Sequence, residues 1–283
     1  MYFRFCLVTF LAMLLEVPAS ANAFFFSTGN PDGLMATLSR VGGPAGIQTE
    51  TADDFVLTQS STRITSATFV GLIPLGTSLN SIAQVEIEFY HVFPKDSGPF
   101  DNRVNTRVNS PADVEIATAT RDSAAGTLSF TPGIINANFT ALNSVVNGIN
   151  PLPNQFTGGE GPVTGQEVQF NVIFTTPIDL PADHYFFRPE VLLTNGDFLW
   201  LSAPRPIVAP GTPFPPGFMD LQSWIRNDDL APDWSRIGTD ITAQGPFNAT
   251  FSLSGNTIPE PSTWGLLAGG LGVLAFWRKR LSN

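Results

Sequence analysis

The hydrophobic and polar positions of this chain alternate with the period of β-strands. Residues 84–90 (Gln-Val-Glu-Ile-Glu-Phe-Tyr) alternate strictly between polar and apolar side chains, as expected of a strand with one face in a core and the other in water. Residues 63–72 and 167–175 are further runs rich in β-branched and aromatic side chains, and residues 247–253 alternate again. Weaker strand signals lie at residues 53–58, 127–131 and 134–146.

A β-hairpin is predicted over residues 184–202. Two strand-like runs, 184–193 and 198–202, flank the sequence Thr194-Asn195-Gly196-Asp197. Asn-Gly favours the positive φ angles of a tight type I′ turn, so we expect the two runs to pair with each other.

The number and spacing of these runs predict an all-β fold. Eight to eleven short strands separated by Gly, Pro and Asn are typical of an antiparallel β-sandwich, of which the jelly roll is one form. Two segments interrupt the pattern. Residues 94–113 are polar and predict a long loop, whereas residues 204–234 are rich in proline and predict a lid or pad on one sheet face, with a helical turn at 219–225.

The N-terminal segment, residues 1–23, has the layout of a secretory signal peptide. Arg4 precedes the apolar run 5–15, which is too short to span a bilayer. Ala21-Asn22-Ala23 then provides small residues at the spacing that signal peptidase cleaves, with cleavage after Ala23 or after Ala21. The predicted secreted domain is therefore residues 24–257.

The C-terminal segment, residues 258–283, has three parts in order. Pro259-Glu260-Pro261 is held extended by its prolines, residues 264–277 are uncharged and mostly apolar, and Arg278-Lys279-Arg280 forms a basic end. An apolar stretch followed by basic residues predicts a short transmembrane helix with a cytoplasmic basic stop. Fourteen residues span only about 21 Å, which is marginal for a permanent anchor.

This three-part tail resembles the PEP-CTERM sorting signal of bacterial envelope proteins. The resemblance implies recognition and processing by a membrane-embedded exosortase, in organisms that also make exopolysaccharide. It covers only the end of the chain. Residues 51–57 and 64–69 are also similar to openings of β-sandwich domains in secreted bacterial surface proteins, which supports the fold alone.

Charge and cysteine content narrow the classes of function. Residues 24–257 carry ten Lys and Arg against 22 Asp and Glu, a net charge of −12. An acidic domain without a basic run argues against nucleic-acid binding. The chain has a single cysteine, Cys6, within the predicted signal peptide, so the secreted domain has no disulfide and no cysteine-based zinc site.

Aromatic and polar residues gathered in the proline-rich segment are the candidates for ligand binding. Sugar rings stack on tryptophan faces, while Asp, Asn and Arg side chains bind sugar hydroxyls. The predicted carbohydrate-binding residues are Trp224, Arg226, Asn227, Asp228, Asp229 and Trp234. The alternative is that the tryptophans hold this segment against the sandwich.

The same segment is a candidate for calcium, the only cofactor that the sequence leaves open. Asp228, Asp229 and Asp233 offer the oxygen ligands that Ca²⁺ prefers, although they lack the order of an EF-hand loop. Asp53 and Asp54 are a second acidic pair, and a solvated acidic loop is the alternative.

No catalytic motif is present in the sequence. Glu86 and Glu88 project from one strand face at a spacing that paired glycosidase carboxylates use, but alternating glutamates are also typical of a solvent face. His91 and His184 have no metal-binding spacing and are expected to be structural.

The sequence therefore predicts an exported protein of the bacterial cell envelope or extracellular matrix. We expect it to be non-enzymatic, associated with exopolysaccharide, and carbohydrate-binding in its secreted domain. The alternatives are a secreted hydrolase acting on polysaccharide and a purely structural or adhesive module.

Overall fold

A computed structural model describes residues 21–43, 46–99, 103–149 and 156–258, together with residues 277, 278 and 280. The described chain is mostly β-strand, which confirms the all-β prediction. The strands are β1 (Ala23–Ser27), β2 (Met35–Leu38), β3 (Thr49–Ile73), β4 (Ile82–His91), β5 (Arg121–Asp122), β6 (Leu128–Ala141), β7 (Asn143–Val145), β8 (Val163–Leu193), β9 (Leu199–Ala203), β10 (Trp224–Asn227), β11 (Ser235–Arg236), β12 (Asn248–Ala249) and β13 (Phe251–Thr257). The helical turns are η1 (Leu79–Ser81), η2 (Ala117–Ala119) and η3 (Ile237–Ile241).

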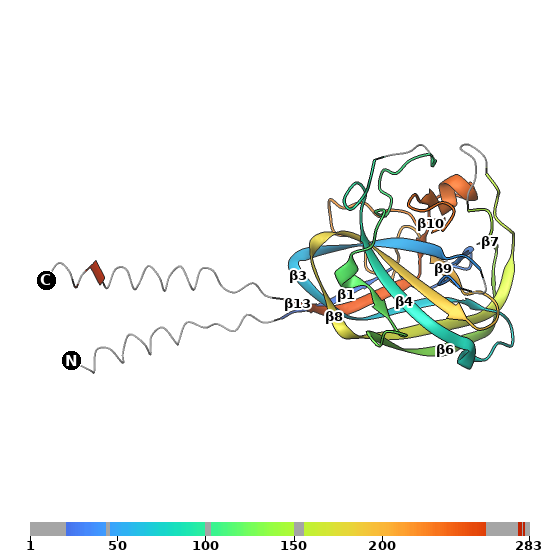
Figure 1. The fold of residues 1–283 in the computed structure, drawn as a ribbon, viewed down its shortest axis with the longest axis horizontal. Helices are drawn as coiled ribbons and strands as arrows, with labels where there is room; N and C mark the ends of the chain where they lie inside the picture. Colours follow the sequence, from blue (N-terminus) through green and yellow to red (C-terminus); the bar gives the residue numbers. More distant parts are fainter. Residues whose placement is uncertain are drawn as a thin grey trace.

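Backbone pairing joins these strands into one large sheet with antiparallel pairing nearly throughout. The central order is β5-β4-β8-β3-β9-β2-β7, and β6, β10 and β13 pair with β8 or β3 outside this path. Among the described strands, only the pairing of β2 with β7 is parallel. Figure 1 shows that the long strands curve, so that the sheet wraps around the interior of the domain.

The two central strands are much longer than the sequence pattern predicted. β3 joins the predicted runs 53–58 and 63–72, and β8 joins 167–175 and the first half of the predicted hairpin. Between the two runs of β3, Ser61 and Thr62 pair with Pro181 and Leu180 of β8, whereas residues 58–60 form an irregularity in the ladder and a second register shift lies between Ile64 and Ser66. Side-chain pattern alone cannot reveal this continuity.

The predicted hairpin between residues 184–193 and 198–202 is wrong. β8 pairs with β3, β4 and β6, while β9 pairs with β2, β3 and β12, so β3 lies between the two expected partners. Gly71 allows β3 and the residues that begin β9 to lie close together, because any side chain at position 71 would overlap the ring of Phe198. Residues 194–196 form a bend in which Gly196 has a positive φ of 83° but Asn195 does not, so the type I′ turn was also predicted wrongly, and the bend connects strands that are not neighbours.

The largest hydrophobic cluster lies inside the curved sheet and takes side chains from all its long strands. It is dominated by phenylalanines in edge-on and stacked contact. Phe69 and Phe170 stack with ring centres 4.7 Å apart, and Phe187 stacks on Phe251 at 4.9 Å. Contacts of this kind add to the burial of apolar area and bring β3, β8 and β13 together.

The two segments that interrupt the strand pattern are largely irregular, as predicted. The exception is β10, which lies inside the proline-rich segment and pairs with the start of β3, where Trp224 faces Ala52 and Arg226 faces Glu50. Residues 219–223 form no helical turn, so that part of the prediction is wrong. Backbone pairing with β3 outweighs the weak local preference of this short segment.

The first and last strands of the domain pair with each other. Ala23 lies opposite Asn256 in the β1–β13 ladder, and the Thr257 backbone N–H donates to the Asn22 carbonyl at 2.8 Å. The start of β1 and the end of β13 therefore lie at the same side of the domain (Figure 1). Among the described residues, no helix has the length and apolar character needed to cross a bilayer. Residues 1–20 of the predicted signal peptide and residues 264–276 of the predicted sorting helix lie outside the described part.

Candidate functional site

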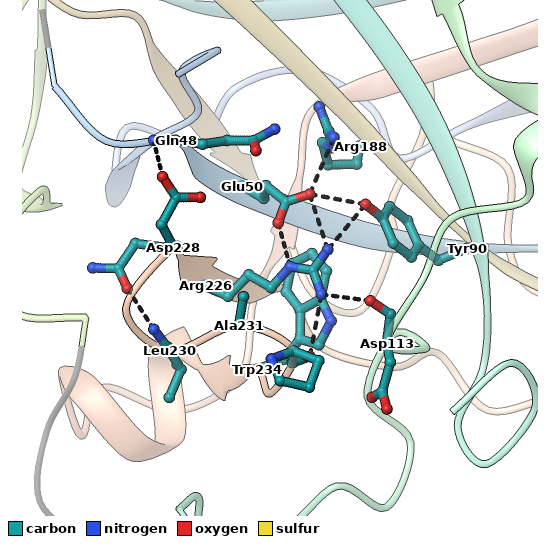
Figure 2. A network of polar contacts seen from close by, with 12 residues as sticks. Gln48, Glu50, Tyr90, Asp113, Arg188, Arg226, Asp228, Leu230, Ala231 and Trp234 are labelled. Carbon is teal, nitrogen blue, oxygen red and sulfur yellow. Dashed lines mark hydrogen bonds and ion pairs between the residues drawn. The ribbon is translucent and has the colours of Figure 1, made fainter. Parts of the chain in front are cut away.

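Arg226, one of the predicted binding residues, lies at the centre of a buried polar network (Figure 2). Its guanidinium forms a two-pronged ion pair with Glu50, directly opposite on β3, and its Nη1 donates to the backbone carbonyls of Asp113 and Pro232 at 2.9 and 3.1 Å. The guanidinium carbon also lies 4.3 Å from the centre of the Trp234 ring. Arg226 thus ties β10 to β3 and to both irregular segments.

A second arginine, Arg188 on β8, extends this network. Its Nη2 lies 3.1 Å from Glu50 Oε1 and also pairs with Glu88, while its Nη1 lies 2.6 Å from Glu190 Oε2 and 3.4 Å from Glu86 Oε1. Tyr90 links the two arginine groups, because its hydroxyl contacts Glu50 at 2.8 Å and Glu88 at 2.6 Å. The cluster therefore places four carboxylates around two guanidinium groups.

The charges of this cluster are adjusted by burial and by the two arginines. Burial alone would raise the pKa of Glu50, but attraction to Arg188 and Arg226 outweighs it and lowers that pKa below its ordinary value. Burial raises the pKa of Glu86 to about 7 despite Arg188, and the neighbouring Glu88 adds to the rise. Burial also holds the pKa of Glu190 well above its ordinary range. These raised pKa values favour the protonated forms of Glu86 and Glu190, which lessens the negative charge around the two arginines.

The tryptophans of the predicted carbohydrate site are internal. Trp224 and Trp234 are each 1% exposed, and they pack in one cluster with Tyr90 and Phe186. The Trp234 N–H donates to the Ala112 carbonyl at 3.0 Å, and one face of its ring is covered by Arg226. A sugar cannot stack on these ring faces in this structure. The predicted stacking platform is absent, and the alternative, in which the tryptophans hold the segment to the domain, describes their packing.

The polar members of the predicted site do not converge on a common ligand. Asn227 is largely buried, and its side-chain oxygen accepts the backbone N–H of Leu230 at 3.0 Å. Asp228 is exposed and accepts the Gln48 backbone N–H at 3.1 Å, and Asp229 is exposed. These three residues shape the turn after β10.

The predicted calcium ligands also lie apart. Asp233 is buried, and its carboxylate lies 3.1 Å from Arg103 Nε and 3.2 Å from Arg107 Nε, whereas Asp228 and Asp229 point to the surface. Within the described ranges, no group of three His, Cys, Asp or Glu side chains could hold a metal ion. The structure therefore does not bring these three aspartates together. A dependence of the protein on calcium elsewhere stays a prediction.

Glu86 and Glu88 do not face an open cleft as a free pair. Both contact the same buried guanidinium, that of Arg188, and Glu88 in addition accepts the Tyr90 hydroxyl. His184 contacts Asp54 through Nε2 at 2.5 Å, and His91 contacts Asp96 through Nδ1 at 2.5 Å. Each histidine thus has a carboxylate partner.

The sequence analysis named Asp53 and Asp54 only as a second acidic pair for calcium and missed that they fasten the proline-rich segment to the sheet. Asp53 accepts the Ser223 hydroxyl at 2.9 Å and the Ala249 N–H at 2.8 Å, and Asp54 accepts the Leu221 N–H at 3.0 Å. Burial, together with the nearby charges of Asp54 and Asp220, holds the pKa of Asp53 well above its ordinary range. Their only signal in the sequence was an acidic pair within a strand-like run.

The sorting residues at the C-terminus lie mostly outside the described part of the chain. Pro259, Glu260, Pro261 and Lys279 are not described, and Arg278 and Arg280 are exposed and helical. At the other end, Ala21 is exposed and Ala23 begins β1. The proximity of Asn22 to Thr257 places the predicted signal-peptidase site beside the start of the sorting signal.

Comparison with known proteins identifies this C-terminal segment. A family model described as the PEP-CTERM protein-sorting motif matches residues 257–280. Searches of curated proteins and of solved structures found no match to the chain. The motif confirms the resemblance drawn from the three-part tail, and it indicates export, processing by exosortase, and a cell-envelope or extracellular destination. The chain therefore carries a PEP-CTERM protein-sorting motif over residues 257–280.

Proposed function

We propose that this protein is a non-enzymatic component of the bacterial cell envelope or extracellular matrix that associates with exopolysaccharide. In this proposal residues 24–257, whose strands form one large curved sheet, are the delivered part, and the two ends of the chain are targeting segments that are removed or retained during export. The observation that carries the proposal is the PEP-CTERM motif, which begins at the last residue of β13.

The pairing of β1 with β13 supports a single domain delivered between two membrane-directed segments. Because Asn22 and Thr257 are hydrogen-bonded, a signal peptide and a sorting tail would leave the domain side by side. Both segments could then enter the same membrane while the folded domain stays outside it. Signal peptidase and exosortase are the partners that this arrangement requires.

The polar network supports a non-enzymatic role. A general acid and a nucleophile need carboxylates that can approach a substrate. Glu86 and Glu88 instead share the guanidinium of Arg188, and Glu50 is engaged by Arg188 and Arg226. The secreted polysaccharide hydrolase remains an alternative that no described group of residues favours.

A purely structural or adhesive module is the second candidate function, and one observation favours it. Trp224 and Trp234, which would mark a sugar-stacking surface, are buried and pack inside the domain. Such a module would contribute bulk and charge to the matrix without a saturable site.

The test uses the producing cells. Envelope, medium and polysaccharide fractions would be probed for the protein in the parent strain and in a strain that makes no exopolysaccharide. Loss of the protein from the surface fraction in the second strain supports association with the polymer. An unchanged distribution contradicts it.

Incubating the purified protein with that polysaccharide, with and without a calcium chelator, would test the other parts of the proposal. Polymer of unchanged length agrees with a non-enzymatic role, whereas shortening of the polymer favours the hydrolase. If the chelator abolishes association with the polymer, the proposal that the protein binds calcium is supported.

A further inference from the structure

A pocket lies where the two irregular segments meet beside β10. Its volume is about 320 Å³, and its wall takes Val108 from the first segment and Arg205, Met219, Asp220 and Trp224 from the second. Both segments interrupted the strand pattern in the sequence, but nothing in the sequence indicated that they share a cavity. The site is separate from the carboxylate network around Arg188, whose residues do not line it.

Trp224, one of the residues that line this pocket, carries an unpartnered N–H group. Trp224 is 1% exposed and its Nε1 has no hydrogen-bond partner, whereas the Trp200 and Trp234 indoles donate to the carbonyls of Thr250 and Ala112 at 2.7 and 3.0 Å. A buried donor without an acceptor is unfavourable, so its presence in a cavity wall indicates a place for an external acceptor.

An unpartnered acceptor lies in the same wall. Asp220 Oδ1 is buried without a hydrogen-bond partner, while its Oδ2 accepts the Asn248 amide at 3.1 Å. The main chain beside it is fixed, because the Arg205 guanidinium donates to the carbonyls of Asp220 and Leu221. Asn248 thus fixes one carboxylate oxygen of Asp220, while the other oxygen has no hydrogen-bond partner.

The rest of the wall determines the chemistry of that ligand. Val108 and Met219 are 66% and 65% exposed, so an apolar surface borders the polar groups. The charge of Arg236 is paired with Asp240, and the Arg205 guanidinium is engaged by carbonyls. With a carboxylate in the wall of an acidic domain, an anionic ligand is disfavoured.

We propose that this pocket binds one neutral sugar unit, whose hydroxyl groups donate to Asp220 Oδ1 and accept from Trp224 Nε1 while its C–H face contacts Met219 and Val108. A hydroxyl is both donor and acceptor, so one polyhydroxylated molecule satisfies both free groups. The indole then contributes its N–H edge, in contrast to the face stacking predicted from the sequence. This inference rests on the proposed association with exopolysaccharide and names the residues that would contact the polymer.

The experiment uses the protein purified as its own cells process it, with ¹⁵N-labelled tryptophan. Glucose, galactose, mannose and their short oligomers would be titrated while the indole N–H signals are recorded by NMR. We expect the Trp224 signal to shift and saturate, with the Trp200 and Trp234 signals much less affected because their N–H groups are already bonded.

Two pocket variants and one control complete the test. Asp220→Asn and Trp224→Phe should each weaken binding by about tenfold or more, since the first replaces a charged acceptor by a neutral amide and the second removes the indole N–H donor. Asp220→Asn nearly preserves side-chain size, which keeps the test valid if Trp224→Phe disturbs the core. Asp179→Asn, an exposed carboxylate of β8 outside the pocket, should leave the affinity unchanged.

Three results would overturn the inference. These are indole signals that do not move with any neutral sugar, binding that survives in both pocket variants, and binding confined to uronic acids. The proposed function has its own readout, the distribution of the protein between polysaccharide and other fractions. A protein that follows the polymer without any indole shift would therefore reject the pocket and retain the proposed function.

Discussion

The guanidinium of Arg226 covers one face of the Trp234 ring at 4.3 Å, and both side chains are buried. The sequence places these residues in a segment whose composition is typical of a sugar-binding surface. In the folded domain the cation that occupies the indole face belongs to the protein itself. Attraction of this kind strengthens when water is excluded, so the pair holds β10 and the following turn against β3.

Replacing Arg226 by methionine should strongly destabilise the domain. Methionine keeps much of the side-chain volume but leaves Glu50 buried with one of its two guanidinium partners removed. Breaking a buried ion pair in this way costs about 3–5 kcal/mol. The free energy of unfolding in urea would be compared with that of the parent protein.

The matched control for this prediction is Arg63→Met. Arg63 also makes a two-pronged contact with a carboxylate, that of Asp179, but on the exposed surface. Because water screens that pair, its loss should change the stability little. Equal effects of the two substitutions would mean that burial does not set the strength of the Arg226 network.

The stability of the domain should depend on the ionisation of Glu86. Its pKa rises from the ordinary 4.5 to about 7 in the folded protein, with Arg188, Glu88 and Asp122 as the charged groups nearby. The folded state thus holds the proton more tightly than the unfolded state. The resulting stabilisation is complete below pH 4.5 and is lost as the pH rises to about 7.

Glu86→Gln removes this titration. We expect the stability of the variant relative to the parent protein to increase steadily from pH 4.5 to about 7 and then to level off. Asp179→Asn is the control, because hydrogen bonding to Arg63 lowers the pKa of Asp179 and moves its effect to more acidic pH. Melting temperatures across this pH range would measure both, and a constant difference for Glu86→Gln would reject the assignment.

Gly71→Ala should destabilise the junction between β3 and β9. A methyl group at this position would overlap the Phe198 ring and lie 2.5 Å from the Leu199 carbonyl oxygen. The substitution would therefore push β9 away from β3. Overpacking of this kind costs about 1–3 kcal/mol. Gly133→Ala in β6 is the matched control, because no atom lies within 4 Å of the added methyl group. Chemical unfolding of both variants would show whether the close approach at Gly71 requires a glycine.

The sorting motif should be required for processing of the protein. Glu260→Ala changes the centre of the Pro-Glu-Pro sequence without touching the described domain, so the protein should fold but accumulate as an unsorted, membrane-held precursor in its own host. Immunoblots of membrane and medium fractions would detect it. Asp179→Asn in the same host is the control for loss of an acidic side chain elsewhere in the chain. Normal processing of Glu260→Ala would show that Glu260 is not needed for sorting.

The sequence by itself determined the fold class and the destination of the protein. Strand alternation is a local property, so residues 84–90 could be assigned to what became β4 from their order alone. The sorting tail is read as an extended motif, a short apolar stretch and a basic end, and such a linear signal needs no partner from elsewhere in the chain.

The tertiary structure alone decided which strands pair and which polar groups are free. The Asn-Gly sequence predicted a hairpin, but β3, a strand far away in the sequence, lies between β8 and β9 and pairs with both. Trp224 and Trp234 were equally good candidates for surface or core, because exposure is set by the residues that fold over them. A cavity with one free indole N–H and one free carboxylate oxygen exists only because distant segments converge, and no local pattern of side chains records that convergence.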